Sequence, residues 1–397
     1  MSAPWNVRWQ VFRQSRANVA GFLEGEQMET LMKGSFRVRL ASLVVGCAVM
    51  GGAVSGAQNH EDEGWDRAAA IGYLDARLTW WMDWETAARD HGTFCVSCHT
   101  VLPYALGRTM LRETAAPGAI ESRLFKNVER RVMAWDQILP FYSDEQFRVG
   151  KTAESRGTEA ILNALILTNR DSREGLLSDT TLRALDNLWA LQTTSGSGKG
   201  AWPWLDFGLE PWETSAAGYY GAALAGVAVG HVPDDYDTSP VNRARVAELR
   251  RYLQREVDNQ NLFNRLTALW ASTSMSGVFT LGQQLAIKDE TLRLQREDGG
   301  WSLASLGLFE RLDGTPVESE SDGYATGLVL HVFQEAGLAV DDHSLSKGLV
   351  WLRTNQSNDG SWPATSLNRA RDPMSDRGRF MRDAATAYAV LALTGSE

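Results

Sequence analysis

Stretches of small apolar residues recur along the second half of the chain, and each of them follows a glycine-rich turn. The clearest examples cover residues 213–230, 322–337 and 383–393, where Ala, Gly and Thr are interspersed with Leu and Val. A longer and more charged stretch precedes each of them and ends with a glutamine, the turn and a tryptophan. Helices made of small residues can pack closely around a common centre, whereas the charged helices would face solvent. The pattern therefore predicts helical hairpins, each with an outer and an inner helix.

The hairpin repeats along the whole chain after about residue 58. Threonines near the start of each small-residue helix mark the repeat, and successive ones lie 53 to 60 residues apart. These markers are Thr100, Thr158, Thr214, Thr267, Thr326 and Thr386. Six hairpins with inner and outer helices describe an all-α (α/α)6 toroid, in which each hairpin is buried only against its neighbours. We predict this toroid as a single domain over residues 58–397, with an open helical solenoid as the alternative.

The first 57 residues have the pattern of a targeting segment. Basic residues precede an apolar run at 40–54, and the small residues 55–57 follow it, as in a signal peptide with its cleavage site. We predict that residues 1–57 are an N-terminal extension and signal peptide, that translation starts at Met28 or Met32, and that the mature protein is exported to the periplasm. A lipoprotein or a signal-anchored protein is the alternative. Because the apolar run is short for a membrane span, we expect no stable span after cleavage.

The composition is that of a globular protein with an acidic surface. Of the 397 residues, 44% are hydrophobic and 22% are charged, so the chain can bury a large core. The formal net charge is -10 and the isoelectric point lies near 5.3, whereas proteins that bind nucleic acids present a basic face to the phosphates. We therefore expect no nucleic-acid partner.

The last hairpin carries the most regular motif, K-G-x-x-x-L-x-x-x-Q-x-x-x-G-x-W. Its fixed positions are Lys347, Gly348, Leu352, Gln356, Gly360 and Trp362. This spacing resembles the QW repeat of squalene-hopene and oxidosqualene cyclases, and degenerate copies centre on Gln192 with Trp202 and on Gln295 with Trp301. The resemblance covers the chain from about Leu182 onward and implies the (α/α)6 toroid shared by terpene cyclases and protein prenyltransferases. In this motif the glutamine would satisfy backbone groups at a helix end, while the tryptophan would cover the turn.

The chemistry of those families is not matched by the residues here. Class II cyclases protonate an alkene with the middle aspartate of D-x-D-D-T, and the nearest equivalent, residues 322–326, has Tyr324 at that position. A phenol with a pKa near 10 cannot replace a strongly acidic carboxyl group. Protein prenyltransferases need a zinc site with a cysteine, and no cysteine follows Cys98. Squalene-type cyclisation and protein prenylation are both disfavoured, and a divergent cyclase that uses Asp322 or Asp383 as its acid is the third alternative.

A C-x-x-C-H motif, formed by Cys95, Cys98 and His99, lies where the first hairpin turns into its inner helix. In c-type cytochromes two such thiols hold haem through thioether bonds, and the histidine binds the iron. A Cys95–Cys98 disulfide and a zinc site are the alternatives, and a thioredoxin-type motif should follow a strand, which the pattern does not predict here. We predict covalent haem c at this site. Candidates for the sixth iron ligand are Met110, Met133 and His91.

Acidic and aromatic residues gather at the predicted starts of the inner helices. The acids would meet on one rim of the toroid, although helix N-termini favour acidic caps in any case. Candidates for catalysis are Glu213, Asp322, Tyr324 and Asp383. The aromatic rings would line a ligand cavity or, as the alternative, cover the turns as part of the core. Candidates for the cavity are Trp202, Trp204, Trp212, Tyr219 and Tyr324.

Taken together, these features predict an exported toroid with haem c at the mouth of its central cavity. It would transfer electrons to a redox partner or oxidise a small apolar ligand, such as a terpenoid or a quinone. Two alternatives stay open: a non-catalytic binding or scaffold protein with a Cys95–Cys98 disulfide, and the divergent terpene cyclase. Whether the protein is an enzyme is left undecided, and a haem-dependent oxidoreductase is favoured over a cyclase if it is one.

Overall fold

The computed structural model describes residues 64–112, 116–232, 239–337 and 342–396. The chain divides into two units, Met1–Glu61 and Asp62–Glu397, and all described residues belong to the second. The predicted signal peptide, the start sites and the prediction of export therefore lie outside the described residues. Within the part of the chain that is described, no helix combines the length and the apolar character needed to cross a membrane.

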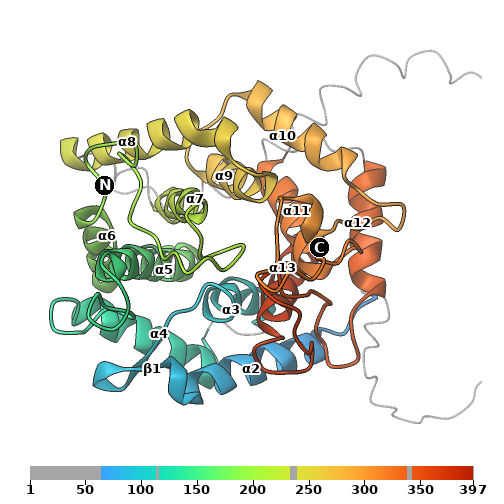
Figure 1. Cartoon of the computed structure of the whole chain (residues 1–397), viewed down its shortest axis with the longest axis horizontal. Coiled ribbons are helices and arrows are strands. Elements are labelled where there is room, and N and C mark those ends of the chain that lie inside the picture. Colours follow the sequence, from blue (N-terminus) through green and yellow to red (C-terminus); the bar gives the residue numbers. More distant parts are fainter. Residues whose placement is uncertain (1–63, 113–115, 233–238, 338–341, 397) are drawn as a thin grey trace, which may run out of the picture. The chain divides into compact units, whose positions relative to one another are not determined.

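Twelve α-helices in the described ranges form two concentric rings (Figure 1). The outer helices are α2 (Arg67–Asp83), α4 (Ala119–Met133), α6 (Asp179–Ala190), α8 (Pro240–Glu256), α10 (Leu281–Arg293) and α12 (Asp342–Thr354). The inner helices are α3 (Val101–Gly107), α5 (Lys151–Glu174), α7 (Ala217–Gly230), α9 (Leu262–Ser274), α11 (Gly323–Ala336) and α13 (Phe380–Thr394). Each inner helix contacts the next, and α13 contacts α3, so the inner ring closes. The predicted all-α (α/α)6 toroid is confirmed, and the open solenoid is not what forms.

Short elements fill the turns between the helices. They are η1 (Glu85–Ala87), β1 (Ala88–Arg89), η2 (Asp90–Gly92), β2 (Thr93–Phe94), η3 (Arg108–Leu111), η5 (Val257–Asn259) and η6 (Leu303–Ser305). Strands β1 and β2 pair antiparallel in the first hairpin. The longer turns otherwise consist of irregular backbone held by side chains.

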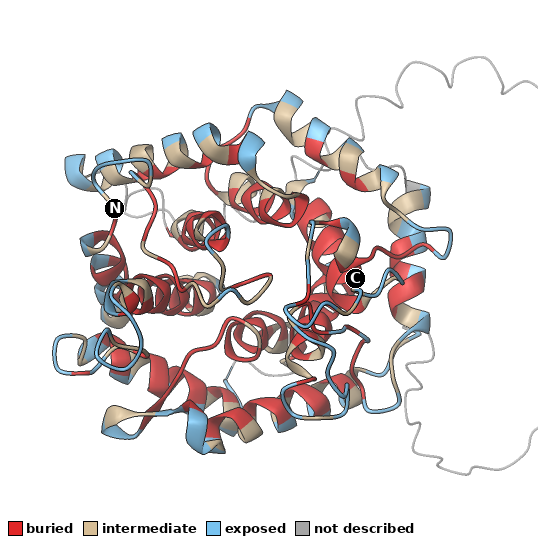
Figure 2. Ribbon diagram, viewed as in Figure 1, coloured by how far each residue is buried: buried red, intermediate tan, exposed pale blue. Residues whose placement is uncertain are grey.

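The inner ring is the hydrophobic core of the toroid. In α7 eleven of fourteen residues are buried, whereas in α8 three of seventeen are. Figure 2 shows the same contrast around the ring, with buried positions throughout the inner helices and exposed positions on the outward sides of the outer helices. Small side chains allow the inner helices to approach: a Cβ atom at Gly327 would lie 2.6 Å from the backbone N of Ala389, and one at Gly107 would lie 2.7 Å from the carbonyl O of Ala387. Only glycine fits such a contact.

The three motif tryptophans close the turns, as the sequence pattern suggests. Each donates its indole N–H to a carbonyl oxygen in the last turn of the outer helix before it, with Nε1–O distances of 2.6 Å, 2.9 Å and 2.7 Å. The pairs are Trp202 with Leu188, Trp301 with Thr291 and Trp362 with Leu352. These bonds satisfy carbonyl groups that a helix end leaves without an intrahelical donor.

The three motif glutamines join one hairpin to the next. Each side-chain amide donates to a carbonyl within its own turn and to a carbonyl at the start of the following outer helix. Gln192 reaches Arg245 of α8 and Gln295 reaches Ser344 of α12, at 3.0 Å and 2.8 Å. Gln356 of the last hairpin reaches Asp66, the N-cap of α2, at 2.9 Å, and accepts from the same residue's N–H at 2.6 Å. The motif therefore closes the ring between its last and first members.

Candidate functional site

The C-x-x-C-H segment follows directly after strand β2, at the start of α3. The backbone N–H of Cys95 donates to the carbonyl O of Ala87 (2.8 Å), and the carbonyl O of Cys95 accepts from Nε1 of Trp81 (2.8 Å). The first bond joins the segment to η1, and the second joins it to α2. The strand before the cysteines differs from our expectation, because two residues are too few to show the alternation from which strands are predicted.

The two thiols are part of the core. Cys95 and Cys98 are buried and are not joined in a disulfide. Burial raises the pKa of the Cys95 thiol to about 12, and it raises the pKa of Cys98 well above its ordinary value, with the nearby charge of Glu213 as a further cause. A thiol that stays protonated at neutral pH is a poor nucleophile. The pair is therefore not arranged for thiol–disulfide exchange.

The imidazole of His99 is held by aromatic rings. It stacks on Phe380 with ring centroids 3.8 Å apart, and it contacts the ring of Trp81 edge-on at 4.9 Å. The ring of Trp212 is tilted relative to it, with centroids 6.1 Å apart. Its Nδ1 lies 2.8 Å from Oγ1 of Thr100. Burial, together with the positive charge of Arg77, lowers the pKa of His99 to about 3. The ring is therefore neutral at physiological pH.

Asp383, a predicted catalytic acid, is bound to a buried arginine. Its Oδ1 accepts from Nε of Arg77 (2.8 Å) and from the hydroxyl of Tyr73 (2.9 Å), and its Oδ2 accepts from Nη2 of Arg77 (3.2 Å) and from the hydroxyl of Thr100 (2.7 Å). Burial raises the pKa of Asp383, and Arg77 acts in the opposite direction. With four donors around it, this carboxylate is saturated and serves as a junction between α2, α3 and α13.

Asp322, the second predicted acid, caps helix α11. Its side chain accepts from the backbone N–H groups of Tyr324 (2.9 Å), Ala325 (2.8 Å) and Leu303 (2.5 Å). Burial raises its pKa to about 6 against these bonds. Asp322 is therefore a helix cap, which is the alternative to catalysis that the sequence pattern left open.

Tyr324 belongs to an aromatic cluster at the centre of the inner ring. Its hydroxyl accepts from Nε1 of Trp212 at 3.0 Å, and its ring lies 5.2 Å from Tyr388 and 5.8 Å from Phe263. Burial raises the pKa of Tyr324 well above its ordinary value. The phenol is therefore a structural member of the cluster and not a proton donor at neutral pH.

Glu213 differs from the other predicted acids because its carboxyl group is free. The residue closes a loop through a β-bridge, in which Glu213 N donates to Leu209 O (2.8 Å) and Leu209 N donates to Glu213 O (2.9 Å). The carboxyl oxygens receive no hydrogen bond from the described residues, and the side chain is half-buried. Burial raises the pKa of Glu213 to about 7, while Lys151 acts in the opposite direction. When ionised, Glu213 raises the pKa of Cys95 and of Cys98, which places it near both thiols.

Glu210 is a second carboxyl group in the same loop, and the sequence did not single it out. It is half-buried, and its carboxyl group has no hydrogen bond to the residues that the structure describes. Burial, and secondarily the charge of Asp206, raise its pKa. A signal was present, since Glu210 stands three residues before Glu213 in a Pro- and Trp-containing loop.

The other predicted residues are divided between the mouth and the outside of the toroid. The indole N–H of Trp204 donates to the carbonyl O of Trp212 (2.7 Å), so Trp204 packs against the loop that carries Trp212. The hydroxyl of Tyr219 donates to the carbonyl O of Leu253 in the outer helix α8 (2.8 Å), so this side chain points outward. Trp202 covers its turn, as described above. Of the suggested iron ligands, Met133 and His91 are exposed and Met110 lies beyond the other end of α3 from His99. No described contact brings these three to His99.

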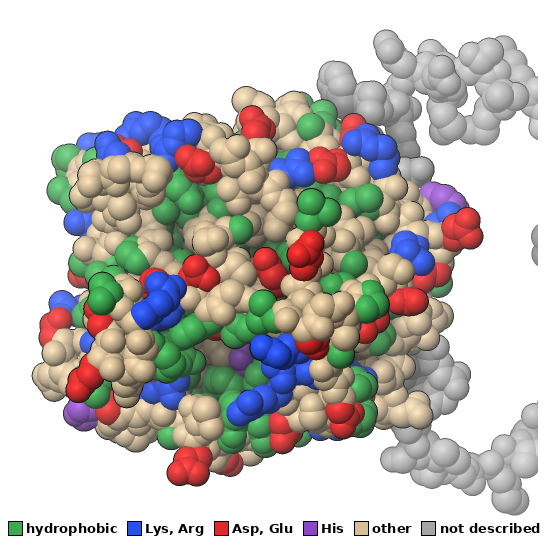
Figure 3. All heavy atoms as spheres, viewed as in Figure 1, with side chains coloured by type: hydrophobic (Ala, Val, Ile, Leu, Met, Phe, Trp, Pro, Cys, Tyr) green, Lys and Arg blue, Asp and Glu red, His purple; other side chains and the backbone are tan. Residues whose placement is uncertain are grey.

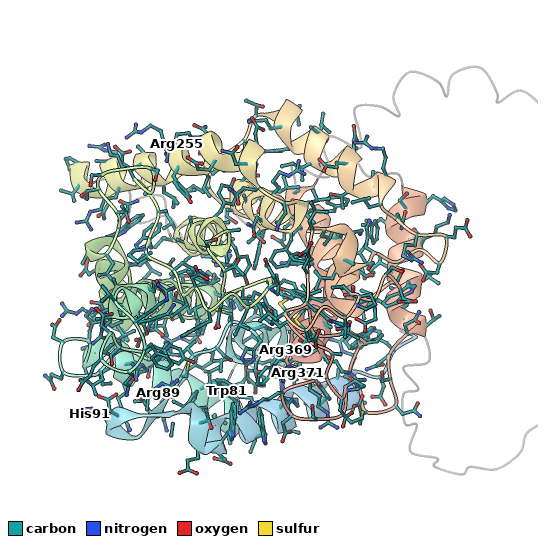
Figure 4. All side chains as sticks on the ribbon, in the orientation of Figure 1. Trp81, Arg89, His91, Arg255, Arg369 and Arg371 are labelled. Atoms are coloured by element: carbon teal, nitrogen blue, oxygen red, sulfur yellow. The ribbon has the colours of Figure 1, made fainter. Side chains whose placement is uncertain are left out.

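The face of the toroid that bears these loops is hollowed. Figure 3 shows hydrophobic side chains and a histidine in the hollow, with Lys or Arg side chains along one side. In the same view Arg369 and Arg371 lie over α3 and α13 (Figure 4). Both are exposed, and neither forms a hydrogen bond or an ion pair with another described residue. Two shallow surface clefts lie elsewhere, one between Met133 of α4 and helix α6 and one at the turn of residues 295–298.

Clustered metal-ligating side chains are not found among the described residues. Across the described ranges, no group of three or more His, Cys, Asp or Glu side chains could hold a metal ion. Cys95 and Cys98 are packed into the hydrophobic core, and His99 is stacked on Phe380. Nothing in the structure tests the covalent haem, which stays a prediction.

Several solved structures resemble this chain in fold at low sequence identity. No family model matches it, and neither does any curated protein. Among solved structures, one described as a glycosidase variant matches with a TM-score of 0.49 and 14% identity, covering 83% of this chain and 97% of that chain. An inactive variant of an α-1,6-mannanase, GH76A of Salegentibacter sp. HEL1_6, in complex with α-1,6-mannotriose, matches with a TM-score of 0.47 and 11% identity, covering 82% of this chain and 100% of that chain.

A further solved structure is described as a glycosidase variant in complex with glucose. It matches with a TM-score of 0.46 and 13% identity, covering 83% of this chain and 98% of that chain. At such identities and TM-scores, we transfer no substrate and no catalytic residue from these proteins to this chain.

Two predictions are corrected by these findings. The expected membership of the squalene cyclase-like family is wrong, because the solved structures named above are described as glycosidases and not as terpene cyclases. The expected function, haem-dependent electron transfer or oxidation, is wrong on the same ground, and the alternative of a non-catalytic scaffold is not better supported. The prediction of a metal-binding protein also conflicts with the lack of a metal-ligand group among the described residues.

Proposed function

We propose that this protein is a carbohydrate-processing enzyme with its active site at the mouth of the toroid and Glu213 as its general acid. One observation carries the proposal: a half-buried carboxyl group with no hydrogen-bond partner among the described residues and a pKa of about 7. A group with such a pKa is partly protonated at neutral pH and can give its proton to a leaving group. The other acids at the inner-helix starts are occupied by backbone or arginine donors.

The surroundings of Glu213 support a ring-shaped substrate. Trp212 is its neighbour in the chain, and the aromatic rings of Trp81 and Phe380 lie around His99 on the same side. Aromatic faces supply large contact areas for flat or ring-shaped molecules. Glycoside hydrolysis uses two carboxyl groups, one that protonates the leaving oxygen and one that acts on the opposite side of the sugar. Glu210 is the candidate for the second.

The reaction that we propose is hydrolysis of a glycosidic bond. Glu213 transfers its proton to the glycosidic oxygen as the bond between that oxygen and the sugar carbon breaks, so the leaving sugar departs as an alcohol. Glu210, as a carboxylate, faces the positive charge that develops on the sugar ring or takes a proton from the attacking water. The water oxygen bonds to the sugar carbon and keeps one proton as the new hydroxyl group, while the other water proton returns to Glu213, either directly or by way of Glu210. One water is consumed for each bond broken.

The test uses the purified protein and a panel of nitrophenyl glycosides and polysaccharides, with release of nitrophenol or reducing sugar as the readout. We expect at least one substrate to be hydrolysed and the Glu213→Gln variant to lose about 100-fold or more in kcat. Glu174→Gln is the matched control, because Glu174 is exposed at the far end of α5 from Lys151. Full activity of Glu213→Gln, or no turnover of any glycoside by the unmodified protein, would overturn the proposal.

A further inference from the structure

A chain of hydrogen bonds runs from a buried ion pair to the ring of His99. Arg77 contacts both oxygens of Asp383, at 2.8 Å and 3.2 Å, and Tyr73 donates to Oδ1 at 2.9 Å. Thr100 links this carboxylate to the histidine, with Oγ1 2.7 Å from Oδ2 of Asp383 and 2.8 Å from Nδ1 of His99. Tyr73, Arg77 and Thr100 belong to the first hairpin, whereas Asp383 belongs to the last, so this relay forms only because the ring closes.

The donors and acceptors along this relay can be assigned in one way only. Burial raises the pKa of Asp383, but the guanidinium of Arg77 contacts both carboxyl oxygens, and Tyr73 and Thr100 also donate to them. With both oxygens occupied as acceptors, Asp383 has no proton to give. The single hydroxyl proton of Thr100 is then donated to Asp383, so that towards His99 the Thr100 oxygen can only accept. Nδ1 of His99 must therefore carry the ring proton. A hydrogen bond to one ring nitrogen fixes the protonation of the other, so Nε2 is left with a lone pair.

The lone pair of Nε2 has no partner in the part of the chain that the structure describes. No described residue forms a hydrogen bond with this atom, and His99 is only partly buried. Stacking on Phe380 and the edge contact with Trp81 keep the ring from turning. Trp212, the neighbour of Glu213, is the third ring beside it, at 6.1 Å.

We propose that Nε2 of His99 is a substrate-binding group, which accepts a hydrogen bond from a hydroxyl of the ligand bound at the mouth. Thr100, Asp383 and Arg77 are then positioning residues, because they keep the ring proton on Nδ1 and leave the lone pair on Nε2. The identity of the ligand as a carbohydrate rests on the proposed function, whereas the ring state and its accessibility do not. An imidazole with its proton on Nδ1 suits this role, because Nε2 is then a hydrogen-bond acceptor and a sugar offers many hydroxyl donors.

The first experiment reads the ring state without any substrate. The full chain is labelled with 15N-histidine, and long-range 1H–15N spectra are recorded at neutral pH, with the His99→Gln variant identifying the His99 signals. We expect Nδ1 to carry the proton in the unmodified protein and in Thr100→Ser, which keeps the hydroxyl group. In Thr100→Val we expect loss of this preference. A proton on Nε2 in the unmodified protein would overturn the inference.

The second experiment reads access to Nε2 and its role. We expect diethyl pyrocarbonate to modify His99, with the modified residue located by mass spectrometry. A carbohydrate that the protein hydrolyses or binds should protect His99 from this modification. We also expect Thr100→Val to raise KM about tenfold with a smaller change in kcat, and Thr100→Ser to restore it. An unprotected or unreactive His99, or an unchanged KM in Thr100→Val, would contradict the binding role. The two proposals can fail separately. If no carbohydrate is hydrolysed, but His99 carries its proton on Nδ1 and is modified by diethyl pyrocarbonate, the proposed function is wrong. The inference that Nε2 is an accessible hydrogen-bond acceptor then still holds.

Discussion

The starts of α11 and α7 occupy equivalent places in the repeat, yet their acids have opposite surroundings. Asp322 directly precedes α11 and accepts three backbone N–H groups, so its carboxyl group is used up in holding the helix start. Glu213 lies four residues before α7, whose start no described side chain caps, and its carboxyl group is free. A shift of a few residues along the loop separates a structural acid from a chemically available one. The position of an acid in the repeat therefore does not decide whether it is structural or chemically available. What decides it is whether backbone N–H groups lie within hydrogen-bond distance of its carboxyl group.

The largest effect that separates these two acids is on catalysis. Replacing Glu213 with glutamine keeps its size but removes the proton that can be transferred, so we expect kcat to fall about 10²- to 10⁴-fold. The free energy of unfolding, measured by urea denaturation, should not fall, because no described hydrogen bond is lost. Asp322→Asn is the matched variant and should keep kcat within about threefold at a temperature where it stays folded. Similar losses of kcat in the two variants would remove the distinction.

A third acid, Asp383 in the first turn of α13, extends the comparison to a buried ion pair. Arg77→Met would leave the Asp383 carboxylate buried without its cation, and removing one partner of such a pair costs about 3–5 kcal/mol of unfolding free energy. We expect a loss of this size by urea denaturation. Arg123→Met is the control, since Arg123 forms an exposed ion pair with Asp83 and should cost under about 1 kcal/mol. Equal losses in the two variants would show that the relay is not anchored as we describe.

The cap itself should have a moderate effect on stability. Asp322→Ala removes the acceptor of three N–H groups at the start of α11, and loss of a helix cap costs about 0.5–2 kcal/mol. Asp322→Asn keeps an oxygen for Tyr324 and Ala325 but loses the one for Leu303, so it should lose less than the alanine variant. Thermal unfolding followed by circular dichroism gives both values. A greater loss in the asparagine variant would contradict the assignment of Asp322 as a cap.

The toroid could be predicted from the sequence because each of its repeats obeys the same physical pattern. Small residues at the inner helices and the Gln–turn–Trp sequence recur at nearly constant spacing, and both have a contact that explains them, such as the bond from Gln356 to Asp66. The markers were less uniform than assumed: Thr214 precedes its helix, whereas Thr267 lies within α9. That difference comes from turns of unequal length and does not disturb the helix count.

The site could be predicted only in part. The cluster of acids and aromatic rings at the inner-helix starts was expected, but which acid is free depends on the path of the loop between Leu209 and Glu213, and no periodicity encodes that path. The relay was missed because it joins residues about 300 positions apart. One signal existed: Tyr73 and Arg77 lie four residues apart on α2, so one face of that helix carries two of the three side chains that donate to Asp383. The motif residue His99 was given a role from its spacing to the cysteines and not from its neighbours.

The resemblance to cyclases predicted the right fold but the wrong family, and the reason is physical. The glutamine and tryptophan of the QW pattern bond to backbone atoms of the turns and the outer helices, so they specify how hairpins stack. They do not contact the mouth, where chemistry would take place. A motif of this kind carries information on the ring, and the residues of the mouth must be weighed separately.

The smallest effect concerns the pH dependence of stability, and its sign distinguishes Glu213 from an ordinary surface acid. Burial raises the pKa of Glu213 from 4.5 to about 7 in the folded protein, so between these values the folded chain holds more protons than the unfolded chain. Stability then falls as pH rises through this window. The titratable groups that interact with the carboxyl group are Lys151, Cys95, Cys98 and Tyr142, and Lys151 is the only basic side chain among them.

We therefore expect the unfolding free energy of the unmodified protein, relative to that of Glu213→Gln, to decrease from pH 4.5 to 7 and to level off above. The activity should decrease above about pH 7, because the proton needed for catalysis is then lost. Urea denaturation and kcat/KM measured at matched pH values check both trends, with Glu174→Gln as the control that should follow the unmodified protein. If the relative stability rises with pH instead, Glu213 is paired in solution with a cation, and the free carboxyl group on which the comparison with Asp322 rests does not exist.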